Sequence, residues 1–169
     1  FTGDGLVDIF VANDGRANFL WVNRGDGRFD EDAVRRGCAI DLAGRAKAGM
    51  GTIAEDVDDD GDLDLLVCNM FRETDSYFEN HGASFRDATA RAGLGAITRR
   101  FTRWGVAWCD FDHDGRLDLY QVNGRIAREA QRYADDPYAE PNTMLRGVSD
   151  AARQPRVAPA HHAQQQQVQ

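Results

Sequence analysis

An aspartate-rich loop recurs along the chain and constrains its fold more than any other feature. The segment DVDDDGDLD at residues 56–64 returns as DFDHDGRLD at residues 110–118, with four aspartates and one glycine at shared positions. Residues 1–9 form a third copy, which begins after the position of the first aspartate. The copies follow one another with a period of about 55 residues, so the chain is predicted to consist of repeated structural units.

The residues around the loop repeat as well. Each loop is followed by a short, mostly apolar run that ends in asparagine, at Asn13, Asn69 and Asn123. Further along each unit, residues 29–37 match residues 85–93 in their phenylalanine, arginine and glycine positions. An acidic patch that arose by chance would not have matching residues on both sides. The copies are therefore predicted to share one architecture.

One unit has the pattern of a small antiparallel sheet. Residues 106–109 and 117–122 are largely apolar runs that enter and leave a loop, which predicts two strands covered on both faces. Residues 18–23 predict another strand, closed by a turn at residues 24–27. Residues 29–37 predict a short helical turn that ends at its glycine. A unit of this length suits one blade of a β-propeller, which closes with about four to eight blades.

The crowded aspartates require a counter-charge. Two unit charges about 4 Å apart repel each other by ~1 kcal/mol in water and by ~4 kcal/mol near a protein surface. Acids at loop positions 1, 3 and 5 converge when the glycine at position 6 allows a sharp turn, and the carbonyl at position 7 adds an oxygen. Ca²⁺ takes about six to eight such oxygen ligands, whereas Mg²⁺ needs a tighter shell and Zn²⁺ favours nitrogen and sulfur. The loops therefore predict Ca²⁺ sites.

The position of the last acid separates these loops from EF-hand loops. An EF-hand places a glutamate at position 12 and continues into a helix. Here position 12 is Val67 or Gln121, each within a strand-like run. The closing acid comes earlier, as Asp64 or Asp118. The sequence thus predicts calcium loops that join two strands.

The loops resemble FG-GAP or VCBS repeats, the calcium-binding blades of integrin α-chain propellers. The resemblance covers roughly residues 1–147 and implies an all-β fold, a partial β-propeller of about three FG-GAP/VCBS blades with calcium-binding inter-strand loops. It also implies a secreted or cell-surface module that binds or scaffolds without chemistry of its own. The wider sequence is similar to the cartilage-acidic-protein (ASPIC/UnbV) type of propeller at residues 11–14, 18–21, 24–29, 49–51 and 92–95.

The resemblance also implies a ligand set for each loop. The opening copy retains two acids and has Thr2 where a further acid is expected. Asp59 and His113, at position 4 of the other two loops, are expected to face water. The implied ligands are Asp4 and Asp8; Asp56, Asp58, Asp60 and Asp64 with the carbonyl of Asp62; and Asp110, Asp112, Asp114 and Asp118 with the carbonyl of Arg116.

Composition divides the chain near residue 148. Residues 1–148 are predicted to be a propeller fragment because the first copy starts in mid-motif, and residues 149–169 a disordered tail rich in Ala, Gln and Pro. The net charge of −8 argues against nucleic acid as a partner, and no apolar run approaches the ~18 residues of a membrane span. An extracellular, periplasmic or cell-surface location is expected. Cys68 and Cys109 are predicted to be buried thiols within strands.

Three functions are compatible with these features. The first is a non-catalytic calcium-binding scaffold for protein interaction or adhesion. The second is a carbohydrate-binding module, for which Trp21, Trp104 and Trp108 are the candidates to stack on a sugar. The third is a Mg²⁺-dependent phosphatase-like enzyme with Asp56 as nucleophile, which the repetition of the motif disfavours. The expected partner is accordingly a protein or a glycan.

Overall fold

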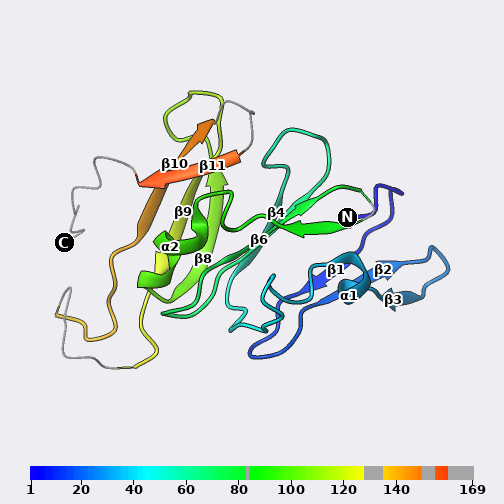
Figure 1. Cartoon of the computed structure of the whole chain (residues 1–169), viewed down its shortest axis with the longest axis horizontal. Coiled ribbons are helices and arrows are strands. Elements are labelled where there is room, and N and C mark those ends of the chain that lie inside the picture. Colours follow the sequence, from blue (N-terminus) through cyan, green and yellow to red (C-terminus); the bar gives the residue numbers. More distant parts are fainter. Residues whose placement is uncertain (83, 128–134, 150–154, 160–169) are drawn as a thin grey trace.

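The chain folds into three antiparallel sheets that follow one another in sequence order (Figure 1). The structure is a computed structural model and describes residues 1–82, 84–127, 135–149 and 155–159. Helices are restricted to short turns, and the three sheets do not close into a ring within this described part. The predicted all-β, partial β-propeller is therefore confirmed.

Each sheet is built from strands that are neighbours in the sequence. The first sheet has three strands in the order β1-β2-β3, and the second and third have four, β4-β5-β6-β7 and β11-β10-β9-β8. The strands are β1 (Ile9–Val11), β2 (Phe19–Asn23), β3 (Phe29–Glu31), β4 (Thr52–Glu55), β5 (Asp64–Val67), β6 (Ser76–Asn80), β7 (Phe85–Asp87), β8 (Arg103–Cys109), β9 (Asp118–Asn123), β10 (Thr143–Ser149) and β11 (Pro155–Pro159).

The sheet registers show how the repeats correspond. Leu65 of β5 lies opposite Phe78 of β6, and Leu119 of β9 lies opposite Leu145 of β10. The acidic loop joins the first strand to the second in both four-stranded sheets, β4 to β5 and β8 to β9. In the first sheet β1 follows the loop, so β1 corresponds to β5 and β9.

The second sheet lies between two hydrophobic clusters because side chains alternate along β5. Leu65 and Val67 belong to the cluster shared with the first sheet, and Leu66 to the cluster shared with the third. All four residues of β5 are buried, as expected for a strand covered on both faces. The first cluster contains Leu20, Val22, Ala33, Cys38, Ala39, Leu65, Val67, Phe78 and Phe85; the second contains Leu66, Tyr77, Ala88, Ala92, Leu94, Leu119, Leu145 and Val157.

Short helical turns follow the last strand of the first two sheets. The helix α1 (Ala33–Arg36) ends at Gly37, whose φ of 85° is left-handed, as the sequence predicts. After β7, the helix α2 (Leu94–Ile97) continues into the 3₁₀ turn η1 (Thr98–Arg100). These turns carry the chain from the edge of one sheet to the first strand of the next.

A buried ion pair joins the second and third sheets. Arg103, the first residue of β8, is 1% exposed and donates from Nε to Asp75 Oδ1 at 2.6 Å, and Asp75 is fully buried. Arg103 also donates to the carbonyls of Glu73, at 2.9 Å, and Thr98. Gln121 of β9 donates to the other oxygen of Asp75 at 2.6 Å. The pair is thus embedded in hydrogen bonds, which a buried charge requires.

The first strands of these two sheets also approach each other closely. Gly51, just before β4, packs against the carbonyl of Trp104 in β8, where an added Cβ would lie 2.3 Å from the oxygen. Gly105 aligns with Gly51 in the repeat, but an added Cβ there meets Val122 at an ordinary 3.5 Å. The two glycines therefore differ in the space around them, because only Gly51 has no room for a side chain.

Two expectations differ from the structure. The segment 155–159, expected to be part of a disordered tail, forms β11, where the Val157 N–H donates to Ala92 at 2.9 Å. Cys109, expected to be buried, is exposed because it ends β8 beside the acidic loop; Cys68 is buried. The remainder of the predicted tail, residues 150–154 and 160–169, lies outside the described residues.

We expect Arg103→Met to lower the free energy of unfolding by about 3–5 kcal/mol, because it leaves the Asp75 carboxylate buried without its charge partner. Urea denaturation measures the change. Arg28→Gln is the matched control, since Arg28 is exposed and lies 3.8 Å from Asp26, and it should shift stability by less than ~0.5 kcal/mol. Equal effects of the two variants would contradict a stabilising role for the buried Arg103–Asp75 ion pair.

Gly51→Ala should destabilise the chain by about 1–3 kcal/mol, because the new methyl group forces β4 away from the Trp104 carbonyl. Thermal unfolding followed by circular dichroism gives the comparison. Gly105→Ala, at the aligned position in the next sheet, is expected to be close to neutral. If Gly51→Ala is also neutral, the close approach of the two strands is not rigid.

Candidate metal sites in the acidic loops

The three acidic loops share one backbone conformation. Position 6 is a glycine with positive φ in each loop, 80° at Gly5, 92° at Gly61 and 82° at Gly115. Position 4 is also left-handed, with φ of 59° at both Asp59 and His113. Non-glycine residues seldom adopt this conformation, although Asp and His are among those that do so most often. Both side chains are exposed, as expected.

Aspartates at positions 1 and 5 hold the curl of the loop by accepting backbone N–H groups. In the second loop Asp56 accepts from Asp60 at 3.1 Å and from Gly61 at 2.9 Å. Asp60 in turn accepts from Asp62 at 2.9 Å. Short polar side chains commonly close turns in this way. The third loop repeats these bonds with Asp110, Asp114, Gly115 and Arg116, and Asp4 of the first loop accepts from Leu6.

The closing aspartate at position 9 connects its loop to the neighbouring strand. Asp64 is buried and accepts from the backbone N–H groups of Asn80, at 2.8 Å, and Val57, at 3.3 Å, and from the Tyr77 hydroxyl at 2.6 Å. These bonds fix the start of the loop, the start of β5 and the end of β6 relative to one another. The corresponding bonds run from Gly147 and Phe111 to Asp118, and from Asn23 and Thr2 to Asp8.

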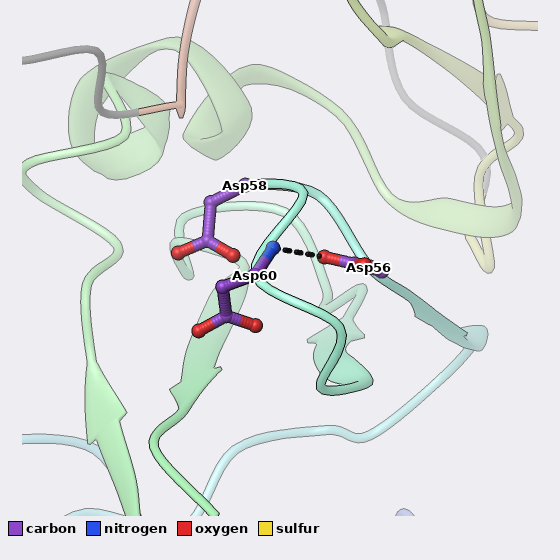
Figure 2. Close-up of side chains that lie close together, drawn as sticks. All are labelled: Asp56, Asp58 and Asp60. Atoms are coloured by element: carbon purple, nitrogen blue, oxygen red, sulfur yellow. Dashed lines mark hydrogen bonds between the residues drawn. The ribbon is translucent and has the colours of Figure 1, made fainter.

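Three carboxylates gather in each complete loop. Asp56, Asp58 and Asp60 each offer an oxygen, and these oxygens lie within 4.8 Å of one another; the same holds for Asp110, Asp112 and Asp118. Figure 2 shows Asp58 and Asp60 side by side, with Asp56 turned toward the backbone nitrogen of Asp60. The oxygens are close enough to share one cation, given the 2.3–2.6 Å ligand distances of Ca²⁺.

Asp58 has an unsatisfied carboxylate oxygen in the second loop. Its Oδ1 atom is buried and has no hydrogen-bond partner among the described residues. Partial burial, followed by the negative charges of Asp64, Asp60, Glu79 and Asp56, raises the pKa of Asp58 to about 6. A bound cation would satisfy this oxygen and offset the repulsion. An all-oxygen donor set of this kind fits Ca²⁺.

Several implied ligands lie apart from these groups. Asp64 belongs to no group of three in the second loop, although Asp118 at the same loop position joins the third-loop group. Asp114 is likewise outside the third-loop group, and its Oδ2 contacts Arg116 and Arg146. Asp62 donates its N–H to Asp60, as Arg116 does to Asp114. In the opening copy, Asp4 and Asp8 belong to no group of three potential metal ligands among the described residues.

The loop motif in the sequence does not indicate two charged residues that lie beside the loops. Glu79 of β6 adds negative charge next to Asp58, and Arg146 of β10 contacts Asp112 and Asp114. Both lie outside the loop motif and follow strand residues that correspond in register, Phe78 and Leu145. Only the pairing of β5 with β6 and of β9 with β10 shows that they approach the loops.

A separate cavity of about 400 Å³ lies beyond the opposite ends of the strands. It is formed by the loop after β5, the residue before β8 and the loop after β9. Arg125 and Glu140 form an ion pair in its wall, with Nε and Oε1 3.3 Å apart. The lining residues are Met70, Phe71, Arg72, Thr102, Arg125, Ile126, Ala127 and Glu140.

Comparisons with known proteins agree with the architecture. The family model of the FG-GAP-like repeat matches residues 1–67 and 56–120. Cartilage acidic protein 1 from Homo sapiens is 30% identical over 145 residues, and its counterpart from Xenopus tropicalis is 29% identical over 148 residues. Each alignment covers 79% of this chain and 21% of the relative, so the chain spans about a fifth of the length of these relatives.

We expect the closing aspartate to contribute more to the stability of the metal-free chain than a converging aspartate does. In EDTA, Asp64→Ala should cost about 2–4 kcal/mol, because the Tyr77 hydroxyl and the Asn80 N–H lose a buried acceptor. Asp60→Ala in the same buffer should cost less than ~1 kcal/mol, because it also relieves repulsion. Chemical denaturation of both variants measures these changes in the free energy of unfolding. An unchanged stability in Asp64→Ala would show that Asp64 does not hold the loop to β6.

Proposed function

Because the chain belongs to the FG-GAP-like repeat family and forms a β-propeller module, we propose that it is a calcium-binding part of a propeller in which Ca²⁺ clamps the acidic loops. The observation that carries the proposal is the buried, unpartnered Oδ1 of Asp58 among three converging aspartates. The ligands proposed for the second loop are Asp56, Asp58 and Asp60, and for the third loop Asp110, Asp112 and Asp118. Asp114 is proposed as a further third-loop ligand, because it occupies the same loop position as Asp60.

The proposed role of the metal is structural. Ca²⁺ would neutralise carboxylates that the fold forces together, and each loop lies between two strands of one sheet. Binding free energy therefore adds to folding free energy, with a gain that grows as the logarithm of the free ion concentration. Among the described residues, these two clusters are the only groups of three or more acids, histidines or cysteines close enough to share a metal ion.

We further propose a non-catalytic scaffold that presents loops to a protein partner, in an extracellular, periplasmic or cell-surface setting. Loops of moderate affinity suit compartments where Ca²⁺ is abundant, since extracellular modules bind with a Kd of about 10⁻⁴–10⁻³ M. In the part of the chain that the structure describes, no helix has the length and apolar character needed to cross a membrane.

Carbohydrate binding is the second candidate function. Trp104 is 47% exposed, and its indole Nε1 donates to the carbonyl of Gly124 at 2.7 Å, next to the cavity residue Arg125. This bond orients the ring, and an exposed aromatic ring can stack on the face of a sugar. Trp21 and Trp108 are partly buried within their sheets and are less suited to this role. A glycan array with calcium-loaded chain, compared with Trp104→Ala, separates the two functions.

Calcium should raise the melting temperature, and EDTA should reverse the shift. Asp60→Ala and Asp114→Ala are each expected to remove about one bound ion in a calorimetric Ca²⁺ titration, because each lies at loop position 5. Asp26→Ala, on an exposed turn, is the control and should leave the stoichiometry unchanged. A melting temperature insensitive to both Ca²⁺ and EDTA would refute calcium binding.

A further inference from the structure

Corresponding positions of the second and third sheets carry opposite charges beside their acidic loops. Phe78 of β6 pairs with Leu65, and Leu145 of β10 pairs with Leu119, the residue that follows the closing aspartate in each case. The next residue along the strand is Glu79 in the second sheet and Arg146 in the third. The repeat therefore places an acid beside one loop and a base beside the other.

Arg146 contacts two of the third-loop aspartates. Its Nε atom lies 2.6 Å from Asp112 Oδ2, and its Nη2 atom lies 2.8 Å from Asp114 Oδ2. The Arg116 guanidinium contacts Asp114 as well, and donates from Nε to the carbonyl of Gly147 at 3.3 Å. The carboxylates at positions 3 and 5 of this loop are thus already engaged with positive charge.

The second loop has no such cation. Among the described residues, no lysine or arginine forms an ion pair with Asp56, Asp58 or Asp60. Glu79 is itself partnered by Arg91 and by His81, whose Nε2 lies 3.2 Å from it, so its charge is partly compensated. The two loops share backbone and motif, but their electrostatic surroundings differ.

We propose that Arg146 is a tethered competitor of Ca²⁺, which makes the loop at 110–118 the weaker of the two complete metal sites and the loop at 56–64 the tighter one. This inference rests on the proposed calcium-binding function. Ca²⁺ can bind Asp112 and Asp114 only after the guanidinium releases them. The free energy of Ca²⁺ binding to the third loop is therefore less favourable by the free energy of those contacts. An arginine cannot lower this cost by losing its proton.

The position of Arg146 on the surface makes the exchange feasible. The side chain is 50% exposed, so it can swing into water when the ion enters, without unpacking the sheet. Because Arg146 lies on β10 and not in the loop, its departure leaves the loop backbone in place. The loops should therefore fill in order as Ca²⁺ rises, and filling of the third loop should free a guanidinium at the surface.

A calorimetric Ca²⁺ titration of the full chain and of Arg146→Gln tests the proposal. In Arg146→Gln the weaker binding step should tighten on the order of tenfold, because the variant neither holds the two carboxylates nor repels the ion. The stronger step should remain unchanged. Asp114→Ala identifies which step belongs to the third loop. Arg24→Gln, which breaks an exposed ion pair with Asp30 in the first sheet, is the matched control and should change neither step.

Two further measurements separate competition from a structural effect. Arg146→Lys keeps the charge and should bind Ca²⁺ nearly as weakly as the unaltered chain, whereas a loss of packing would make it resemble Arg146→Gln. The Arg146 Nε–H resonance, assigned by its absence in Arg146→Gln, should shift in the NMR spectrum over the Ca²⁺ range of the weaker step.

The outcomes distinguish the inference from the function on which it rests. If neither the unaltered chain nor Arg146→Gln binds Ca²⁺, the proposed function fails and the inference fails with it. If both bind with the same weaker constant, calcium binding stands and the role of Arg146 is refuted. A weaker step that loosens in Arg146→Gln would likewise overturn the proposal, because it would make Arg146 a support of the site.

Discussion

One carboxylate at the end of each acidic loop sets the geometry on which the rest of the structure depends. Asp8, Asp64 and Asp118 each accept a backbone N–H from the beginning of their own loop and another from the adjacent strand. An ionised carboxylate has several acceptor sites and no donor, so one side chain can hold two segments at a fixed spacing. The aspartates at positions 1, 3 and 5 then emerge from a loop whose two ends are joined through this carboxylate.

The sheets are stabilised by their neighbours as much as by their own hydrogen bonds. The alternating side chains of β5 enter two different hydrophobic clusters, one on each side of the second sheet. Arg103 adds a buried link between the second and third sheets, where Gly51 brings the first strands together. Stability in such an array is expected to depend on nearest-neighbour interfaces, so a change at one interface affects both sheets that form it.

Local patterns in the sequence predicted the strands, the loops and the helical turn at Gly37, because each depends on residues within one repeat. The convergence of Asp56, Asp58 and Asp60 is also local. Features that arise from strand register or from neighbouring sheets could not be read in this way. Examples are the approach of Arg146 to Asp112 and the exposure of Cys109 at the rim. In the same way, β11 owes its order to β10 and to Ala92, which composition does not show.

The packing of Val157 has a consequence for synthesis of the chain. Val157 is buried against the second hydrophobic cluster, far along the sequence from Leu66 and Tyr77, with which it shares that cluster. On the ribosome, these apolar side chains emerge roughly 80–90 residues earlier, which at about 5–20 residues per second leaves their cluster incomplete for several seconds. The nascent second sheet therefore has an interval in which chaperones can engage it, and this interval ends when the last described strand arrives.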